Sequence, residues 1–148
     1  MKKLVFSQKA FIVKDGKLLL VKKGEKDPFH PNEWEVPGGR LEFGETLEEH
    51  IKREVWEEVG IFVEPGRPFS MWSWFMTIGE DEVQAVAIGR VCKATAFELS
   101  TAHRAKDDYL SSIQWVDIDD LLQFDFIDEM MPTVEAFIEL YRKGEIES

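Results

Sequence analysis

Residues 39–61 read GRLEFGETLEEHIKREVWEEVGI, and this stretch predicts a glycine turn followed by a helix. Thr46 suits the N-cap of the helix, and Glu49, three residues later, completes a capping box. Gly60 suits the position after the last turn, where the backbone adopts a left-handed conformation. We therefore predict a helix over residues 46–59.

Acidic side chains lie against the apolar side of this predicted helix. At about 100° per residue, one face carries four apolar residues: Leu47, Ile51, Val55 and Val59. Glu58 points into this face, Glu54 lies at its edge, and Glu57 lies close to Glu54. A carboxylate at the boundary of the core costs free energy unless it is paired or bound to a cation. The helix alone leaves two interpretations open: an acidic strip on the surface, or a site for Mg²⁺ or Mn²⁺.

The residues before the helix favour the metal site. Gly38 and Gly39 allow the backbone to approach a ligand closely, because glycine has no Cβ atom. A glycine carbonyl can also bind a metal ion, and the neighbouring Arg40 suits a phosphate group. The loop and the helix together predict a site for a metal ion and a phosphorylated ligand.

The same stretch resembles the Nudix box, G-x5-E-x7-R-E-U-x-E-E-x-G-U, in which U is an apolar residue. Every defined position of the box is filled, by Gly39, Glu45, Arg53, Glu54, Val55, Glu57, Glu58, Gly60 and Ile61. The preceding residues 34–38 and the hairpin pattern of the first strands are also similar to this family. The resemblance implies an α/β/α sandwich with a mixed β-sheet, formed by a single domain over residues 1–148.

The resemblance also implies a reaction and roles for individual residues. The implied reaction is Mg²⁺-dependent hydrolysis of the diphosphate linkage in a nucleoside diphosphate derivative, with Mn²⁺ as an alternative ion. The implied metal ligands are the carbonyl of Gly39 and the carboxylates of Glu54, Glu57 and Glu58. Glu45 and Arg53 are expected to support catalysis by orienting the loop and the acidic cluster.

The general base and the substrate contacts are less narrowly defined by the sequence. We predict that the base is Glu54 or Glu58. Glu98, Asp107 and Asp108 are further candidates, because the base of related enzymes can also be an acid on a later loop. For substrate binding we predict contacts from Arg40, Trp34 and Asp108.

The substrate class favoured by the sequence is a (deoxy)nucleoside triphosphate, including oxidised ones, cleaved to the monophosphate and pyrophosphate. ADP-ribose or another nucleotide sugar is the first alternative, although residues 74–77 lack the proline that ADP-ribose enzymes of this family tend to carry there. A non-catalytic nucleotide-binding regulatory module is the second alternative. A purely structural or protein-interaction domain is the third.

Outside the box, alternating and periodic apolar residues predict a mixed sheet covered by helices on both faces. Asp15-Gly16 is typical of a tight hairpin turn. The predicted strands cover residues 5–14, 18–21, 34–37, 69–78, 83–94 and 113–118, and a terminal helix covers residues 132–143.

Three tryptophans permit either packing or base stacking, and a fourth is expected to pack. Trp72 and Trp74 fall on one face of a strand, where one of them can stack on a base or pack in the core. Trp34 is either a loop anchor or a base platform. Trp56 faces away from the acidic cluster, so we expect it to pack on a neighbouring segment or a second subunit.

The histidines and the cysteine suggest no separate function. The spacing of the three histidines does not match a zinc site. His50 is one turn before Glu54, yet we expect it to be solvated rather than to border the metal site. We expect Cys92 to be buried in a strand.

The composition of the chain narrows the classes of molecule that it is expected to bind. The chain has 148 residues, and its acids outnumber its bases 29 to 18, giving a net charge of −11. This balance disfavours generic nucleic-acid binding, which needs a basic patch. The absence of a long apolar run disfavours a membrane span, and a single cysteine permits no intrachain disulfide. We expect a cytoplasmic protein with a nucleotide-like small-molecule substrate, and the aromatic residues permit a homodimer.

Overall fold

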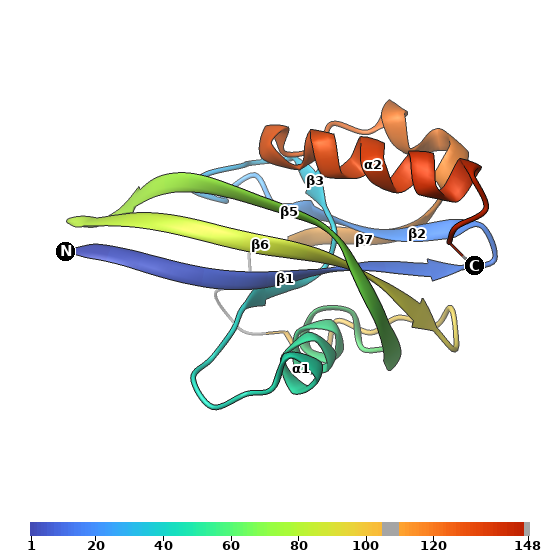
Figure 1. Ribbon diagram of the computed structural model, residues 1–148, viewed down its shortest axis with the longest axis horizontal. Coiled ribbons are helices and arrows are strands. Elements are labelled where there is room, and N and C mark those ends of the chain that lie inside the picture. Colours follow the sequence, from blue (N-terminus) through green and yellow to red (C-terminus); the bar gives the residue numbers. More distant parts are fainter. Residues whose placement is uncertain (105–109, 147–148) are drawn as a thin grey trace.

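A strongly curled mixed sheet organises the chain (Figure 1). The computed structural model describes residues 1–104 and 110–146. The strands are β1 (Lys2–Lys14), β2 (Lys17–Lys23), β3 (Trp34–Glu35), β4 (Gly38–Arg40), β5 (Val63–Ile78), β6 (Asp81–Ala94) and β7 (Leu110–Asp117). The helices are α1 (Leu47–Val59) and α2 (Met131–Arg142), preceded by two short 3₁₀ helices at Ile118–Gln123 and Asp128–Met130.

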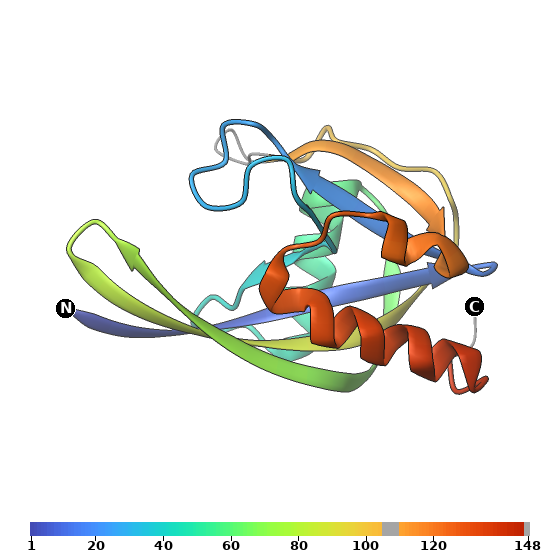
Figure 2. The same ribbon diagram turned by 90° about the horizontal axis from the view of Figure 1, so that it is seen from above.

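The order of the sheet places β1 at its centre. The strands run β3-β2-β1-β6-β5, with β4 also paired to β1 and β7 to β2. β1 is parallel to β6, whereas the other pairs within the described ranges are antiparallel. The predicted mixed sheet is therefore confirmed. The outer ends of β1, β5 and β6 extend beyond both helices (Figure 2).

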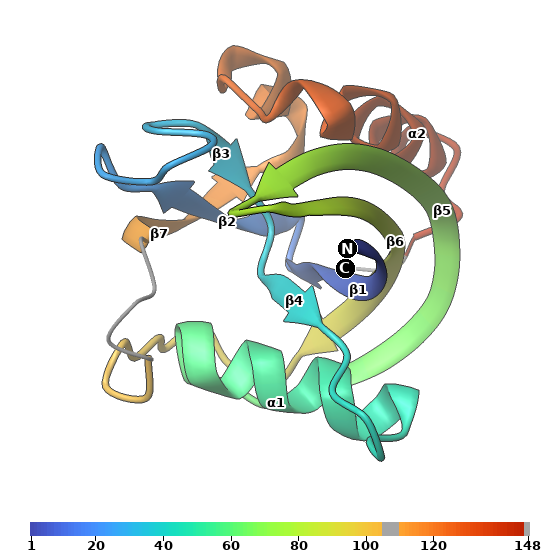
Figure 3. The ribbon, with the colours of Figure 1, turned by 90° about the vertical axis from the view of Figure 1, so that its left-hand side faces the viewer.

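The two helices cover opposite faces of the sheet, as Figure 3 shows. Ala10 and Ile12 of β1 belong to the core cluster that contains the apolar face of α1. Phe11 and Val13 alternate with them and belong to the core under α2. The α/β/α sandwich expected from the sequence is confirmed. No helix of the described part of the chain is long and apolar enough to cross a membrane.

Local sequence signals explain the turns and caps. Asp15 and Gly16 have φ angles of 47° and 76°, as the predicted hairpin turn requires. The Thr46 side chain accepts from the Glu49 amide, and the Glu49 side chain accepts from the Thr46 amide, so the capping box is confirmed. Gly60 ends α1 with a φ of 72°.

Several boundaries differ from the sequence-based prediction. β1 begins at Lys2, and β5 begins at Val63, because their outer parts pair with β6 even where the apolar alternation is weak. The glycine turn continues into β4, which pairs with β1. The 3₁₀ helices were not predicted. Leu47 was predicted to be in the core but is 45% exposed, because it lies in the first turn of α1, where polar side chains fill the contact with the sheet.

Candidate active site

The predicted metal ligands meet in one cleft of about 500 Å³ between β4 and α1. Its lining consists of Lys23, Glu35, Gly38, Gly39, Arg40, Glu42, Glu54, Glu57, Glu58 and Leu110. β4 reaches this position because residues 38–40 pair with residues 7–9 of β1. The loop and the helix, separated in the sequence, therefore form the two sides of one acidic cleft.

Gly39 and Glu54 are in close apposition. A Cβ atom added to Gly39 would lie 2.7 Å from both carboxylate oxygens of Glu54, so a larger residue here would displace this carboxylate. The adjacent Gly38 amide donates to Glu58 Oε1 at 3.3 Å, and Glu58 is only 8% exposed. Both contacts agree with the prediction that Glu58 points inward and Glu54 lies at the edge.

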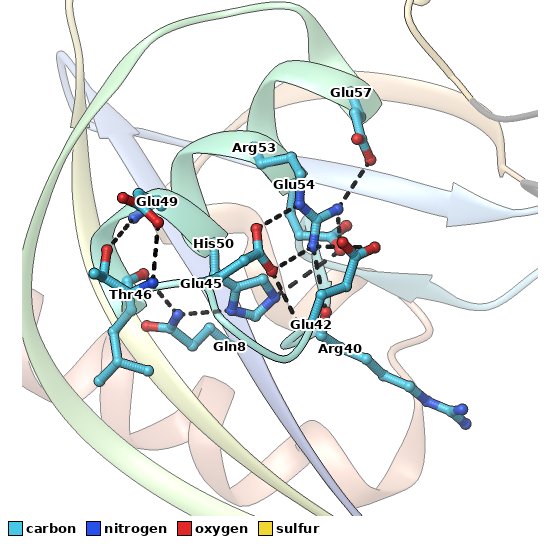
Figure 4. A network of polar contacts seen from close by, with 11 residues as sticks. Gln8, Arg40, Glu42, Glu45, Thr46, Glu49, His50, Arg53, Glu54 and Glu57 are labelled. Atoms are coloured by element: carbon cyan, nitrogen blue, oxygen red, sulfur yellow. Dashed lines mark hydrogen bonds and ion pairs between the residues drawn. The ribbon is translucent and has the colours of Figure 1, made fainter.

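Arg53 holds the acidic residues around the cleft (Figure 4). Its Nε and Nη2 donate to Glu45 at 2.7 and 2.9 Å, and its Nη1 donates to Glu54 at 3.2 Å and to Glu57 at 3.3 Å. Hydrogen bonding from Arg53 lowers the pKa of Glu45 to about 2. Arg53 therefore links the loop that carries Glu45 to the two glutamates of α1, Glu54 and Glu57.

Glu54 differs electrostatically from Glu45. Burial raises the pKa of Glu54, Arg53 opposes this rise, and the nearby Glu57 carboxylate adds to it. A raised pKa makes the carboxylate a stronger base and favours charge compensation by a bound cation.

His50 is buried, so the expectation that it is solvated was wrong. It is 0% exposed because Gln8 of β1 lies beneath it, with Gln8 Nε2 only 2.8 Å from His50 Nδ1. The other ring nitrogen, Nε2, lies 3.9 Å from Glu54 Oε1. Burial is the largest cause of the lowered pKa of His50. The ring is thus buried next to Glu54, which lines the acidic cleft.

The residues of the cleft fit a hard divalent cation in their chemistry. Carboxylate and carbonyl oxygens are the ligands that Mg²⁺ prefers, and the missing Cβ of Gly39 leaves its backbone open to Glu54. Within residues 1–104 and 110–146, no three acidic, histidine or cysteine groups already converge on one point. The carboxylates of Glu54 and Glu57 both accept hydrogen bonds from Arg53, and this explains why they do not converge on a common point.

A second cleft of about 420 Å³ adjoins the acidic one on the α2 side of the sheet. It is lined by Lys9, Lys23, Asp27, Phe29, His30, Glu35, Trp72, Trp74, Phe75, Met76, Thr77, Ile127, Glu129 and Met130. Trp72 and Trp74 of β5 face this cleft together, as their alternation predicted. Lys23 and Glu35 line both clefts, so the two clefts adjoin at these residues.

Three charged residues at this junction were missed by the sequence analysis. Glu35 accepts from Lys9 Nζ at 2.5 Å, and Lys23 Nζ lies 2.9 Å from its other oxygen. Burial alone would raise the pKa of Glu35, but the charges of Lys9 and Lys23 lower it to about 2. The available signal was a set of charged residues inside otherwise apolar strands, which is costly unless they pair.

The other predicted site residues differ in where they lie relative to the two clefts. Trp34 packs edge-on against Phe124, with ring centroids 5.2 Å apart, and lines neither cleft. Arg40 lines the acidic cleft, but its side chain extends away from the glutamates (Figure 4). No contact in the described ranges joins Glu98 to the cluster. Asp107 and Asp108 lie outside the described residues.

The remaining aromatic and sulfur groups behave as expected. Trp56 stacks between Phe62 and His103, at centroid distances of 4.7 and 4.3 Å, which confirms packing on neighbouring segments. Cys92 is fully buried, as predicted.

The fold and the site identify the class of protein. The NUDIX domain model matches residues 8–137, which is most of the chain. The chain therefore belongs to the Nudix family and is a Nudix hydrolase.

Individual relatives agree with this assignment. Phosphatase NudJ of Escherichia coli strain K12 is 30% identical over 112 residues, which are 76% of this chain and 68% of that protein. A MutT-like protein of Streptomyces ambofaciens is 48% identical over 50 residues, but these cover 34% of this chain and only 29% of that protein. The crystal structure of a MutT protein from Methanosarcina mazei Go1 superposes with a TM-score of 0.67 at 25% identity, covering 98% of each chain.

Substituting the two glycines of the loop should have different effects, one on turnover and the other on stability. We expect Gly39→Ala to lower Mg²⁺-dependent turnover by roughly 100-fold with little loss of stability, because the new Cβ displaces only the mobile end of Glu54. Gly38→Ala should instead cost about 2 kcal/mol or more, since its φ is 150° and its Cβ would meet the backbone carbonyl of Gln8 at 2.2 Å. Thermal unfolding and turnover of both variants check this. Equal losses of stability would contradict the proposed role of Gly39.

Proposed function

We propose that the protein hydrolyses a (deoxy)nucleoside triphosphate, including oxidised ones, to the monophosphate and pyrophosphate, with Mg²⁺ bound in the acidic cleft. The observation that carries this proposal is that the two clefts adjoin at Lys23 and Glu35. One is acidic and carries the donors for a metal ion, and the other is aromatic and has the size of a small-ligand pocket. A nucleotide has the same two parts, a base and a charged phosphate chain.

The proposed roles follow from position in the two clefts. Trp72 and Trp74 form a wall on which a base can stack. Lys9 and Lys23 lie where the aromatic cleft meets the acidic cleft, and their positive charges suit phosphate groups placed between the two clefts. Asp27 also pairs with Lys23, at 3.8 Å.

The carbonyl of Gly39 and the carboxylates of Glu54, Glu57 and Glu58 would hold the metal. Bound there, Mg²⁺ supplies charge neutralisation for the diphosphate and a more acidic water. Glu54 or Glu58 would remove a proton from the attacking water, and burial favours Glu54 by raising its pKa. Arg53 and Glu45 would keep these carboxylates oriented.

The aromatic cleft beside the acidic cleft supports a mononucleotide, because the two clefts offer one place for a base and one for a phosphate chain. The names of the relatives, a phosphatase and MutT proteins, are compatible with this preference. Nucleotide-sugar hydrolysis and binding without turnover are the outcomes against which the proposal is tested.

A substrate panel tests the proposal directly. Phosphate release after pyrophosphatase coupling is measured for nucleoside triphosphates and 8-oxo-dGTP, with phosphatase coupling for ADP-ribose. We expect turnover of at least one triphosphate with Mg²⁺ and none with excess EDTA. Turnover of ADP-ribose alone would replace the proposed substrate class. Ligand-induced thermal stabilisation without any turnover would indicate a binding module.

A further inference from the structure

We propose that His50 is a positioning residue, whose Nε2–H is directed at Glu54 by a series of hydrogen bonds that begins at the exposed Glu48 and continues through the buried Arg90 and Gln8. This inference rests on the proposed metal site, because it concerns how one of the ligands is held. It assigns a role to two buried polar residues, Gln8 and His50, that the proposed reaction does not use.

The orientation of the Gln8 amide is fixed from two sides. Arg90 Nη1 donates to Gln8 Oε1 at 3.2 Å, and an arginine can only donate. Gln8 Nε2 donates to the Leu47 carbonyl at 2.8 Å, and a carbonyl can only accept. Rotating the amide by 180° would oppose donor to donor and acceptor to acceptor, so Nε2 must face α1.

Arg90 is itself held in place. Its Nε donates to the Gly66 carbonyl at 3.0 Å, and its Nη2 donates to Glu48 Oε1 at 2.7 Å. The residue is 7% exposed, so its guanidinium has little freedom to turn. The hydrogen bonds therefore run from Glu48 of α1 to Arg90 of β6 and on to Gln8 of β1. From Gln8 they return to α1 at the Leu47 carbonyl.

This arrangement determines which ring nitrogen of His50 carries the proton. The second hydrogen of Gln8 Nε2 points to His50 Nδ1, 2.8 Å away, so Nδ1 must accept. A neutral imidazole with an accepting Nδ1 carries its proton on Nε2. Protonating Nδ1 would set two N–H groups against each other inside the protein.

The resulting Nε2–H faces the acidic cleft. His50 Nε2 is buried and completes no hydrogen bond within the described part of the chain. Glu54 Oε1 lies 3.9 Å away, and the backbone of Gly39 and Arg40, which also acts on the pKa of the ring, lies on the same side. A shift of about 1 Å in the Glu54 carboxylate would complete a hydrogen bond. The opposite tautomer would present a lone pair to the carboxylate and repel it. The fixed amide of Gln8 thus sets the tautomer of His50, and the tautomer of His50 orients Glu54, a proposed metal ligand.

The tautomer is tested by nitrogen NMR of the protein labelled with ¹⁵N-histidine and freed of metal by EDTA. His50 is assigned by its loss in His50→Leu, since the chain has three histidines. We expect a neutral ring with the proton on Nε2 at pH 7. A proton on Nδ1, with or without one on Nε2, would overturn the proposal.

The consequence for the metal site is tested without substrate, by titrating Mn²⁺ and following free Mn²⁺ by electron paramagnetic resonance. Loss of a residue that orients a metal ligand typically weakens binding about 10–100-fold. We expect a weakening in this range for His50→Leu. Thr133→Val is the matched control, because it removes a buried hydrogen bond to Ser70 on the α2 side of the sheet. Unchanged Mn²⁺ affinity in His50→Leu would overturn the proposal.

Gln8→Glu keeps the size of the side chain and provides a test even if His50→Leu fails to fold. The introduced carboxylate cannot donate to Nδ1, so we expect the NMR spectrum to show a proton on Nδ1. Mn²⁺ affinity should fall, although an added negative charge alone would raise it. A spectrum and an affinity like those of the wild type would refute the proposed series of hydrogen bonds. Because neither readout uses a nucleotide, absence of turnover in the substrate panel would not be confused with failure here.

Discussion

Replacing Glu57 with glutamine is expected to lower Mg²⁺-dependent turnover by on the order of 1,000-fold, while leaving the protein folded. The side chain is 42% exposed, and Arg53 Nη1 donates to it at 3.3 Å, so little packing depends on its charge. As a proposed metal ligand, however, it would lose the anionic oxygen that binds the cation. Steady-state turnover of the substrate found in the panel, measured over a range of Mg²⁺ concentrations, gives the size of the effect.

Glu49→Gln is the matched control for this variant. It removes one carboxylate from the same helix, but glutamine still serves in a capping box, so the N-terminus of α1 keeps its cap. Glu49 is not among the residues that line the acidic cleft. We expect turnover within about twofold of the wild type, with unchanged Mg²⁺ dependence. If both variants lost activity equally, net charge rather than metal binding would explain the loss.

The acidic cleft could be predicted from the sequence because its main parts are local. A helix has a known period, so the positions of Glu54 and Glu58 relative to the apolar face follow from the sequence alone. His50, one turn before Glu54 on the same side of α1, was expected to be solvated. That side is covered by Gln8 and Arg90, which come from strands about 40 residues away in either direction. No local pattern carries that information.

The junction between the clefts could not be predicted for a related reason. Lys9, Lys23 and Glu35 belong to three different strands, and their contact depends on the register of β1, β2 and β3. Each residue alone reads as a polar interruption in a strand. Only the folded sheet shows that two lysines share one buried carboxylate. Pairing of this kind makes the free energy of unfolding depend on pH.

Glu35→Gln is expected to lower the free energy of unfolding by about 3 kcal/mol at pH 7. The side chain is 5% exposed, and the lysines reduce its pKa from an ordinary 4.5 to about 2. A carboxyl group whose pKa is lowered by folding stabilises the protein at pH values above 4.5. That stabilisation is lost as the pH falls towards 2, because the folded state must then be protonated as well. The difference between wild type and variant should therefore be constant near pH 7 and shrink below pH 4.5.

Urea unfolding of both proteins between pH 3 and pH 7 measures this dependence. Asp117→Asn is the appropriate control, since it removes a carboxylate that pairs with Lys17 at 2.7 Å on the surface, where both side chains are well exposed. Exposed pairs contribute at most about 1 kcal/mol, so this variant should differ little from the wild type. A Glu35→Gln deficit that stayed the same down to pH 3 would mean that lost packing, rather than the charge of Glu35, stabilises the junction. In that case the charge of Glu35 would not be what holds Lys9 and Lys23 between the clefts. Their proposed contact with the substrate phosphates would then have to be tested by substrate binding.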